Sequence, residues 1–423
     1  MDIWGELEWR GAVAQSTDPG LPDLLRNESL TVYLGIDVTA DSLHVGHLFG
    51  LMNLARLQRA GHRPIALLGG GTTLIGDPSG REEERPLLDD ESIRANAEAI
   101  RAQVERFVDL SPGTGLLVNN AEWLRPLRLT DFLRDVGKHF TVNVMIAKES
   151  VRARLEEREQ GISYTEFSYM LLQAYDFLHL FNDHGCRLQI GGSDQWGNIT
   201  AGIELIRRTR GDHAYGLTFP LITSASGRKF SKSDPDNPWL SPERTSPYRF
   251  FQYWLNTDDR DVGTYLRLLT DLPREEVEAL DRATTEHPER REAQQALAAD
   301  LTARVHGEEA AEAARRASDA LFGGDPTTLS ERELLEVFAD APSTEVPRSA
   351  LGDGGLGVID LAADVGLEGS KSAARRTLDQ GGLYVNSVQE RDPDRRIREQ
   401  DLVAGRYLLL RKGRKRYHLV RFG

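Results

Sequence analysis

Apolar, strand-like runs alternate with helical patterns through the first 220 residues, and this alternation constrains the fold more than any other feature. The runs are Thr31–Ile36, Pro64–Leu68, Gly115–Val118, Arg187–Ile190 and Leu217–Ile222. Helical patterns cover residues 43–60, 90–109, 163–180 and 195–209. Strands that alternate with helices are typical of a parallel sheet covered by helices. The sequence therefore predicts an α/β fold for this part of the chain.

The sequence changes character in its second half. Residues 242–338 are rich in Ala, Glu, Arg and Leu and poor in β-branched residues, which favours a helical domain. Pro342, Pro347 and the glycine-rich run that follows them indicate a linker over 341–355. Two short helical patterns and further strands come after it. We expect domains at residues 1–230, 231–340 and 356–423.

Composition and charge exclude several classes of protein. With 423 residues, of which 39% are hydrophobic, and no apolar run near 18 residues, the chain is expected to be globular, without a membrane partner. The N-terminus lacks the pattern of a secretion signal, and the single Cys186 permits no internal disulfide, as expected in the cytoplasm. The net charge of −14 argues against general affinity for nucleic acid.

The end of the chain is basic, although the chain as a whole has a negative net charge. Residues 406–423 hold seven Lys or Arg residues and no acid. A solvated tail would explain this run equally well. Strand-like Leu408–Leu410 and Leu419–Val420 favour a folded basic hairpin instead.

Two familiar nucleotide motifs are excluded. Residues 71–76 have the GxxxxG spacing of a P-loop, but Asp77 and Pro78 stand where a lysine and a hydroxyl residue are needed to hold phosphates and Mg²⁺. No GxGxxG fingerprint follows the first strand. A P-loop NTPase and a standard dehydrogenase are therefore disfavoured.

A histidine pair follows the first strand, as His44-Val45-Gly46-His47. Asp41 or Ser42 is the expected N-cap, which would place both imidazoles on one face of the first helical turns. There the backbone N–H groups and the helix dipole favour a triphosphate, and Gly46 permits close approach. A surface histidine pair is the alternative for an isolated motif. A metal site is disfavoured because neither HExxH spacing nor a CxxC partner is present.

A lysine segment, Lys229-Phe230-Ser231-Lys232-Ser233, lies between Gly227 and Pro235. We expect a loop whose two ammonium groups could stabilise charge developing on a leaving pyrophosphate. A solvated basic turn is the alternative for the isolated pentapeptide.

One predicted helix carries three polar residues on one face. Tyr169, Gln173 and Asp176 stand at i, i+4 and i+7 in a segment otherwise rich in Leu, Met and Phe. Periodicity alone would favour the wet side of the helix over a binding pocket.

Together and in this order, HVGH and KFSKS resemble the two ATP signatures of class I aminoacyl-tRNA synthetases. Residues 191–198, GGSDQWGN, narrow the resemblance to the bacterial tyrosyl-tRNA synthetase family. It implies a Rossmann-like parallel-sheet catalytic domain, a helical domain and a C-terminal S4-like α+β RNA-binding domain. It also implies activation of L-tyrosine with ATP and Mg²⁺ to tyrosyl-adenylate and pyrophosphate, then transfer to the 3′-terminal ribose of tRNA(Tyr). Members are cytoplasmic homodimers, with the interface expected at about 120–180.

The resemblance also assigns site residues, with no tightly bound metal. The tyrosine contacts would be Tyr33, Asp77, Tyr169, Gln173, Asp176 and Gln195. ATP would be bound by Gly35, Asp37, Gly46, Arg81, Arg85, Gly192, Asp194 and Lys232. The catalytic groups would be Thr39, His44, His47, Lys229 and Lys232. RNA contacts would be Arg411, Lys412, Arg414, Lys415 and Arg416.

Two alternatives remain. A tryptophan-activating enzyme of similar fold is disfavoured by Tyr33 and Asp176, which would read a phenol. The second is an RNA-binding protein that kept a synthetase body without its activity. It is disfavoured because both ATP motifs and the pocket residues are intact.

Overall fold

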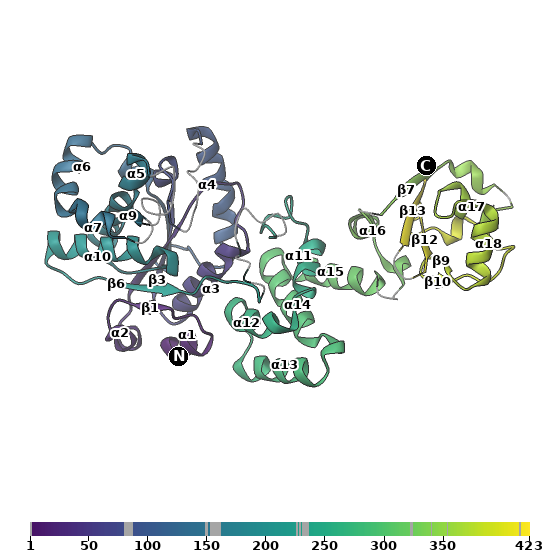
Figure 1. Ribbon diagram of the computed structural model, residues 1–423, viewed down its shortest axis with the longest axis horizontal. Helices are drawn as coiled ribbons and strands as arrows, with labels where there is room; N and C mark the ends of the chain where they lie inside the picture. Colours follow the sequence, from purple (N-terminus) through teal and green to yellow (C-terminus); the bar gives the residue numbers. More distant parts are fainter. Residues whose placement is uncertain are drawn as a thin grey trace. The chain divides into compact units, whose positions relative to one another are not determined.

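The computed structural model describes residues 2–79, 88–148, 151–152, 162–225, 227, 230, 237–321, 325–339, 341–352, 354–413 and 416–423. The chain divides into two compact units, whose helices and strands are labelled in Figure 1. The first comprises Met1–Thr245 and Leu255–Leu297. The second comprises Ser246–Trp254 and Ala298–Gly423.

A six-stranded sheet forms the centre of the first unit, in the order β1-β6-β5-β2-β3-β4. Its strands are β1 (Gln15–Ser16), β2 (Thr31–Ile36), β3 (Arg63–Leu68), β4 (Leu116–Asn119), β5 (Cys186–Gly192) and β6 (Tyr215–Phe219). All neighbouring pairs are parallel except β1–β6. The chain therefore adds β3 and β4 on one side of β2, and then β5 and β6 on the other.

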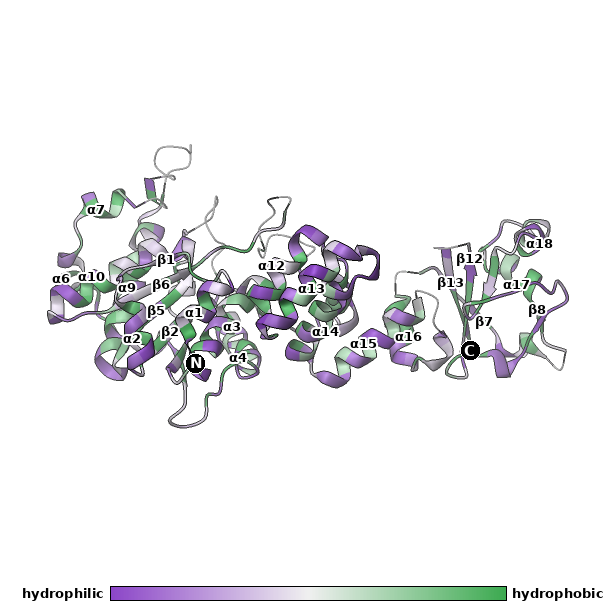
Figure 2. Ribbon diagram, turned by 90° about the horizontal axis from the view of Figure 1, so that it is seen from below, coloured by the Kyte–Doolittle hydropathy of each residue, from purple (hydrophilic) through white to green (hydrophobic). Residues whose placement is uncertain are grey.

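Helices cover both faces of this sheet. The first unit contains α1 (Ile3–Trp9), α2 (Leu21–Asn27), α3 (Val45–Arg59), α4 (Asp90–Val104), α5 (Ala121–Leu124), α6 (Leu129–Asp135), α7 (Val142–Ile146), α9 (Tyr164–His184), α10 (Trp196–Arg210), α12 (Asp259–Leu269) and α13 (Arg274–Glu286). Tyr33 and Ile65 on one face share a hydrophobic core with Phe177 of α9. On the opposite face, Leu34 lies against Gly50 of α3. In Figure 2, α13 is mainly hydrophilic.

The α/β prediction is confirmed, with local differences. β2 has the predicted bounds, but β6 ends at Phe219 instead of continuing to residue 222. Pro220 follows it and has no N–H to donate to a neighbouring strand. The two-residue strand β1 has no periodicity from which it could be predicted.

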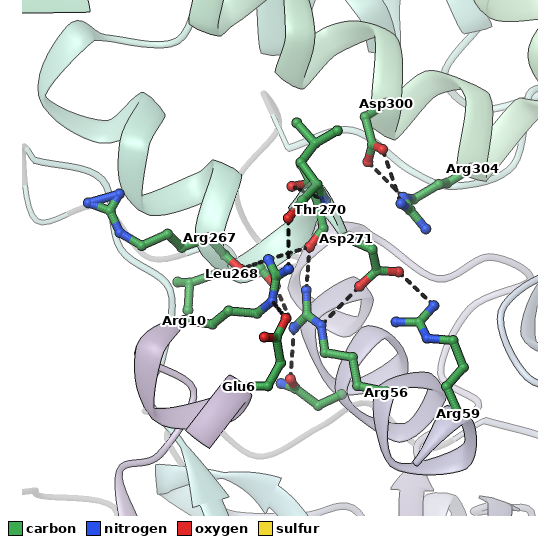
Figure 3. A network of polar contacts seen from close by, with 12 residues as sticks. Glu6, Arg10, Arg56, Arg59, Arg267, Leu268, Thr270, Asp271, Asp300 and Arg304 are labelled. Atoms are coloured by element: carbon green, nitrogen blue, oxygen red, sulfur yellow. Dashed lines mark hydrogen bonds and ion pairs between the residues drawn. The ribbon is translucent and has the colours of Figure 1, made fainter. Parts of the chain in front are cut away.

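Two buried arginines bind the turn after α12 to the helices around the sheet (Figure 3). Arg56 of α3 donates to the carbonyls of Leu268 and Thr270, at 3.0 and 2.6 Å, and to Asp271 Oδ1 at 3.0 Å. Arg10, just after α1, donates to the Thr270 carbonyl at 2.8 Å. The last carbonyls of a helix have no partner within the helix, and these guanidinium groups supply one. Burial lowers the pKa of Arg56 to about 10, and the Asp271 carboxylate opposes the fall.

The second unit combines helices with a five-stranded sheet. Its helices are α11 (Pro247–Leu255), α14 (Glu292–His306), α15 (Glu308–Leu321), α16 (Glu331–Val337), α17 (Val358–Asp364) and α18 (Lys371–Asp379), although α11 and α14 each have residues in both units. The sheet order is β10-β9-β12-β13-β7, and β8 pairs with β11. The strands are β7 (Ser343–Val346), β8 (Leu356–Gly357), β9 (Leu383–Val385), β10 (Val388–Gln389), β11 (Arg396–Ile397), β12 (Tyr407–Lys412) and β13 (Arg416–Phe422).

The five-stranded sheet is buried on both faces. Leu408 and Leu410 pack with α17 and α18 on one face. Leu409 packs on the other face with Tyr248 of α11 and Leu334 of α16. The helices before residue 340 and the strands after it therefore share one hydrophobic core.

The segment predicted as a linker contains a strand. Residues 343–346 form β7, which pairs in parallel with β13. The flanking prolines and glycines obscured the extended pattern of Thr344 and Val346. A cut near residue 349 would therefore leave β7 without the strand to which it pairs.

None of the helices in the described part of the chain is long and apolar enough to cross a membrane.

Candidate active site

The predicted pocket residues gather where the strand order of the sheet reverses. β2 has β3 on one side and β5 on the other, so the connections after β2 and β5 lead away in different directions. In open α/β sheets, ligands bind in the crevice at the carboxyl ends of such strands. Asp37 and Thr39 follow β2, and Ser193–Gln195 form a 3₁₀ helix (η3) directly after β5. The topology therefore brings together segments that lie far apart in the sequence.

Tyr33 and Asp176 form the buried end of the site. Tyr33 of β2 is fully buried, with its ring edge-on to Phe177 at a centroid distance of 5.2 Å. Its hydroxyl has no hydrogen-bond partner among the described residues. Burial, and then the nearby Asp176 carboxylate, raise the pKa of Tyr33 well above its usual value. A buried hydroxyl without a partner points to a polar ligand group here.

Two residues that the sequence analysis missed hold the Asp176 carboxylate. Asn120 Nδ2 donates to Oδ2 at 2.9 Å, and Trp123 Nε1 donates to Oδ1 at 2.7 Å. Both donors follow the carboxyl end of β4, which is parallel to β2 and β3, so they lie at the same edge of the sheet as Asp37. Burial nevertheless raises the pKa of Asp176 to about 7, since the two hydrogen bonds only partly oppose the cost of burying a charge.

A second chain of polar contacts links three predicted residues. Gln195 Nε2 donates to Asp77 Oδ2 at 2.7 Å, and Gln173 Nε2 donates to Gln195 Oε1 at 3.2 Å. Asp77 is buried, and burial followed by the charge of Asp37 raises its pKa. Tyr169 is also buried, one helical turn before Gln173. A buried carboxylate beside amide oxygens suits an ammonium group.

Glycines leave room above the sheet. Gly35 lies on the same face of β2 as Tyr33, because side chains alternate along a strand, and a Cβ there would meet nothing within 4 Å. At Gly192 a Cβ would lie 2.5 Å from Asp194 Oδ1, so a side chain would displace this carboxylate. Both positions suit close approach of a ligand to the backbone.

The histidine turn differs from the prediction. α3 begins at Val45, and its N-cap is His44 instead of Asp41 or Ser42. The Ser42 hydroxyl is used elsewhere, since it accepts from Ser241 N at 3.0 Å and donates to the Leu43 carbonyl at 2.8 Å. The Nδ1 atoms of His44 and His47 accept from the backbone N–H groups of Gly46 and His44, at 3.0 and 3.3 Å. In each neutral imidazole the proton is therefore on Nε2, and the two rings lie 4.0 Å apart.

Four predicted ATP-site residues, Arg81, Arg85, Lys229 and Lys232, lie outside the described residues. Arg414 and Lys415 of the predicted RNA site do so as well. Within the described part of the chain, no group of three or more His, Cys, Asp or Glu side chains could hold a metal ion.

The described basic residues near the end of the chain differ in their surroundings. Lys412 Nζ donates to the buried Glu368 carboxylate at 2.9 Å. Burial would raise the pKa of Glu368, but hydrogen bonds from Lys412 and Thr377 outweigh it and lower the pKa. The Arg411 guanidinium lies 3.7 Å from the ring centroid of Tyr384. Arg416 is exposed. Lys412 therefore contacts a buried carboxylate directly, whereas the exposed Arg416 acts on Glu368 through its charge.

Family models match most of the chain. The model described as "tRNA synthetases class I (W and Y)" matches residues 25–323. A second, for the C-terminal domain of tyrosine–tRNA ligases, matches residues 333–420. The chain belongs to the class I tRNA synthetases of the tryptophan and tyrosine family.

Relatives over the full length narrow the family to its tyrosine branch. The tyrosine–tRNA ligase of Roseiflexus castenholzii is 56% identical over 421 residues, 99% of each chain. That of Geobacillus stearothermophilus is 50% identical over 427 residues, 100% of each chain. A truncated mitochondrial tyrosyl-tRNA synthetase from Aspergillus nidulans is 31% identical, with a TM-score of 0.66 over 76% of this chain and 94% of that one. The chain is thus a member of the tyrosine–tRNA ligases.

In this ligase, the Asp176 carboxyl should titrate near neutrality. We expect a midpoint of about 7 by ¹³C NMR of labelled aspartate in the unliganded protein. Since the unfolded carboxyl releases its proton near pH 4, ionisation of Asp176 costs stability as the pH rises through this window. Trp123→Phe should move the midpoint upward, because it removes a donor that favours the charged form.

The matched control for this titration is Trp9→Phe, which removes an indole remote from Asp176 and should leave the midpoint unchanged. A wild-type midpoint near 4, or a downward movement in Trp123→Phe, would contradict the assignment.

Proposed function

We propose that this ligase activates L-tyrosine with ATP, forming tyrosyl-adenylate and pyrophosphate, and then transfers tyrosine to the 3′-terminal ribose of tRNA(Tyr). The observation that carries the proposal is the buried pair of Tyr33 and Asp176, in which the hydroxyl lacks a partner within the described part of the chain and the carboxylate is oriented by two donors. A phenol that donates to Asp176 and accepts from Tyr33 would satisfy both groups.

The other end of tyrosine is assigned to the second polar chain. Asp77, Tyr169 and Gln173 would hold the α-ammonium group, supported by the buried carboxylate and the amide oxygens around it. Gln195, with Asp194 beside it, would lie along the carboxylate and the ribose. No protein nucleophile is needed, because the tyrosine carboxylate itself attacks the α-phosphate of ATP and pyrophosphate leaves.

The nucleotide is assigned to the ends of β2 and β5. Gly35 and Gly192 would allow the nucleotide to approach the backbone, with Asp37 and Thr39 nearby. His44, Gly46 and His47 lie at the start of α3, where the helix dipole favours negative charge and the Nε2 protons of the two histidines can donate to phosphate oxygens. Lys229, Lys232, Arg81 and Arg85 would complete the positive charge around the leaving pyrophosphate. Charge stabilisation and positioning would then supply the rate.

ATP would enter as its Mg²⁺ complex, with the metal carried on the phosphates. The reaction would take place in the cytoplasm, where tRNA and ATP are both available.

The decisive assay is tyrosine-dependent exchange of labelled pyrophosphate into ATP. Tyrosine should support exchange and tryptophan should not, because Tyr33 and Asp176 would pair with a phenol. Exchange supported by tryptophan alone would favour the other branch of the family. No exchange with either amino acid would favour an RNA-binding protein without activity.

Asp176→Ala should lower kcat/KM for tyrosine and narrow its preference over phenylalanine. A hydrogen bond to a charged group contributes about 1.5–3 kcal/mol, which is roughly 10- to 150-fold in rate. Phenylalanine has no hydroxyl that could bond to Asp176, so its kcat/KM should fall much less. Both values are measured by pyrophosphate exchange.

Asp183→Ala is the matched control for Asp176→Ala, since it removes an exposed carboxylate from the same helix. An unchanged ratio of tyrosine to phenylalanine use in Asp176→Ala would refute the pocket as assigned.

RNA contact is assigned to the second unit. Arg411, Lys412 and Arg416, together with Arg414 and Lys415 outside the described residues, would supply the basic side chains, and α18 adds exposed Arg375 and Arg376. Such side chains would bind phosphates of tRNA(Tyr) with an affinity that falls as salt rises.

Arg416→Ala should weaken tRNA binding and reduce the slope of log K against log salt by about 0.7–0.9, the share of one phosphate contact. Lys412→Ala should in addition lower the unfolding temperature, because it removes the cation that contacts the buried Glu368 carboxylate. Binding is measured by fluorescence titration over a salt series, with unfolding followed by circular dichroism. An Arg416→Ala slope equal to that of the wild type would remove Arg416 from the RNA surface.

A homodimer is proposed from an exposed apolar surface on the first unit. Its members lie between residues 129 and 164 and are exposed by 41–74%: Leu129, Leu133, Val142, Val144, Ile146 and Tyr164. Exposed apolar surface of this kind is typical of protein–protein interfaces. The surface falls within the interface expected at about 120–180.

Val144→Glu should weaken dimerisation by about 2 kcal/mol or more, roughly 30-fold, because it buries a charge without a partner. Sedimentation equilibrium measures the dissociation constant. Val388→Glu, at an exposed valine of the second unit, is the matched control and should not change it. A Val144→Glu protein that dimerises as tightly as the wild type would place the interface elsewhere.

A further inference from the structure

The chain returns to the histidine turn directly after the lysine segment. Residues 238–240 pair with the residues before α3: Leu240 N donates to the Leu43 carbonyl at 2.8 Å, and Val45 N donates to the Pro238 carbonyl at 3.2 Å. His44 and Trp239 are opposite each other in this antiparallel bridge. The backbone that leaves the lysine segment is therefore fixed to the residue that caps α3.

The Trp239 side chain contacts two polar groups, the His44 imidazole and the Arg244 guanidinium. Its indole meets the His44 imidazole edge-on, at a centroid distance of 5.9 Å and an angle of 83°. The Arg244 guanidinium lies 4.4 Å from the indole centroid. Asp41 in turn holds Arg244 through a 2.5 Å contact between Oδ1 and Nε. The order of contact is Asp41, Arg244, Trp239, His44.

Ala225, before the lysine segment, contacts α12, and Phe230, within the segment, contacts both the histidine turn and α12. A Cβ at Gly46 would lie only 3.0 Å from the Phe230 carbonyl oxygen. Ala225 N donates to Asp261 Oδ1 at 2.7 Å, and the Phe230 ring lies 5.4 Å from that of Tyr265. Both flanks of residues 231–236 are thus attached around the start of α3.

We propose that Trp239, held by Arg244 and Asp41, is a positioning residue for the activation step. It fixes the His44 imidazole and the point at which the chain returns from the lysine segment, so that the two ATP motifs keep one relative position. Trp239 itself contacts neither tyrosine nor ATP in this assignment. The inference rests on the proposed roles of His44 and the lysines.

The experiment compares Trp239→Ala and the milder Trp239→Phe and Arg244→Lys in tyrosine-dependent pyrophosphate exchange. Trp239→Ala should lower kcat about 10- to 100-fold, the size expected from misplacing a reacting group by about 1 Å. The dissociation constant for tyrosine, measured by equilibrium dialysis, should stay within about twofold, because the pocket around Asp176 is untouched. Trp239→Phe keeps an aromatic ring and should retain more activity than Trp239→Ala.

A double-mutant cycle tests the order of contact. Asp41→Ala and Arg244→Ala should each lower kcat, and together they should lower it little more than Arg244→Ala alone, since both act through Trp239. Arg274→Ala is the matched control: Arg274 also lies over a tryptophan, at 5.7 Å from the Trp9 centroid, and pairs with a carboxylate, but away from the site.

Exchange at the wild-type rate in Trp239→Ala would overturn the inference and leave the proposed function intact. The inference would also be overturned if the effects of Asp41→Ala and Arg244→Ala on kcat were additive, or if Arg274→Ala lowered kcat as much as Arg244→Ala does. If Trp239→Ala does not fold, Trp239→Phe and Arg244→Lys provide the test. The inference then still requires that each of these variants has a lower kcat and an unchanged affinity for tyrosine. Absence of exchange in the wild-type protein would instead refute the proposed function itself.

Discussion

The reversal of strand order beside β2 is the constraint on which the catalytic unit depends. Parallel strands need connections that cross a face of the sheet, and the chain uses both sides of β2 in succession. Tyr33, Asp37, Gln195 and the start of α3 meet at one edge for this reason. The family resemblance names these residues, but the sheet topology explains why residues so distant in sequence can serve one small ligand.

Function and stability conflict in the pocket. Tyr33, Asp77 and Asp176 are buried polar groups, and burial raises the pKa of each. A chain selected for stability alone would place apolar side chains there. Asn120 and Trp123 reduce the cost for Asp176 by donating to both of its oxygens. The remaining free-energy cost of burying these groups is typical of a site whose polar groups find their partners when the ligand binds.

Local patterns predicted the strands and main helices of the catalytic unit because each is long and strongly periodic. The polar face of α9 was visible in sequence, yet only the fold brings Gln173 to Gln195. Asn120 and Trp123 escaped notice because they belong to a four-residue helix and its cap, with no periodicity of their own. His44 was not expected as an N-cap, since serine is a more common capping residue, but the Ser42 hydroxyl accepts from Ser241 N, a distant contact that local sequence does not reveal.

The two units are interleaved along the chain. Ser246–Trp254 belongs to the second unit, whereas Leu255–Leu297, which follows it, belongs to the first. Tyr248 packs with Leu409 and Leu419, so its core partners are synthesised long after it. During translation the second unit therefore cannot complete its core when the first unit has all its residues, because β12 and β13 have not yet been made. A single recombination crossover would therefore separate the two chain segments of at least one unit and disrupt its hydrophobic core. This limits how the two units can be exchanged as modules in evolution.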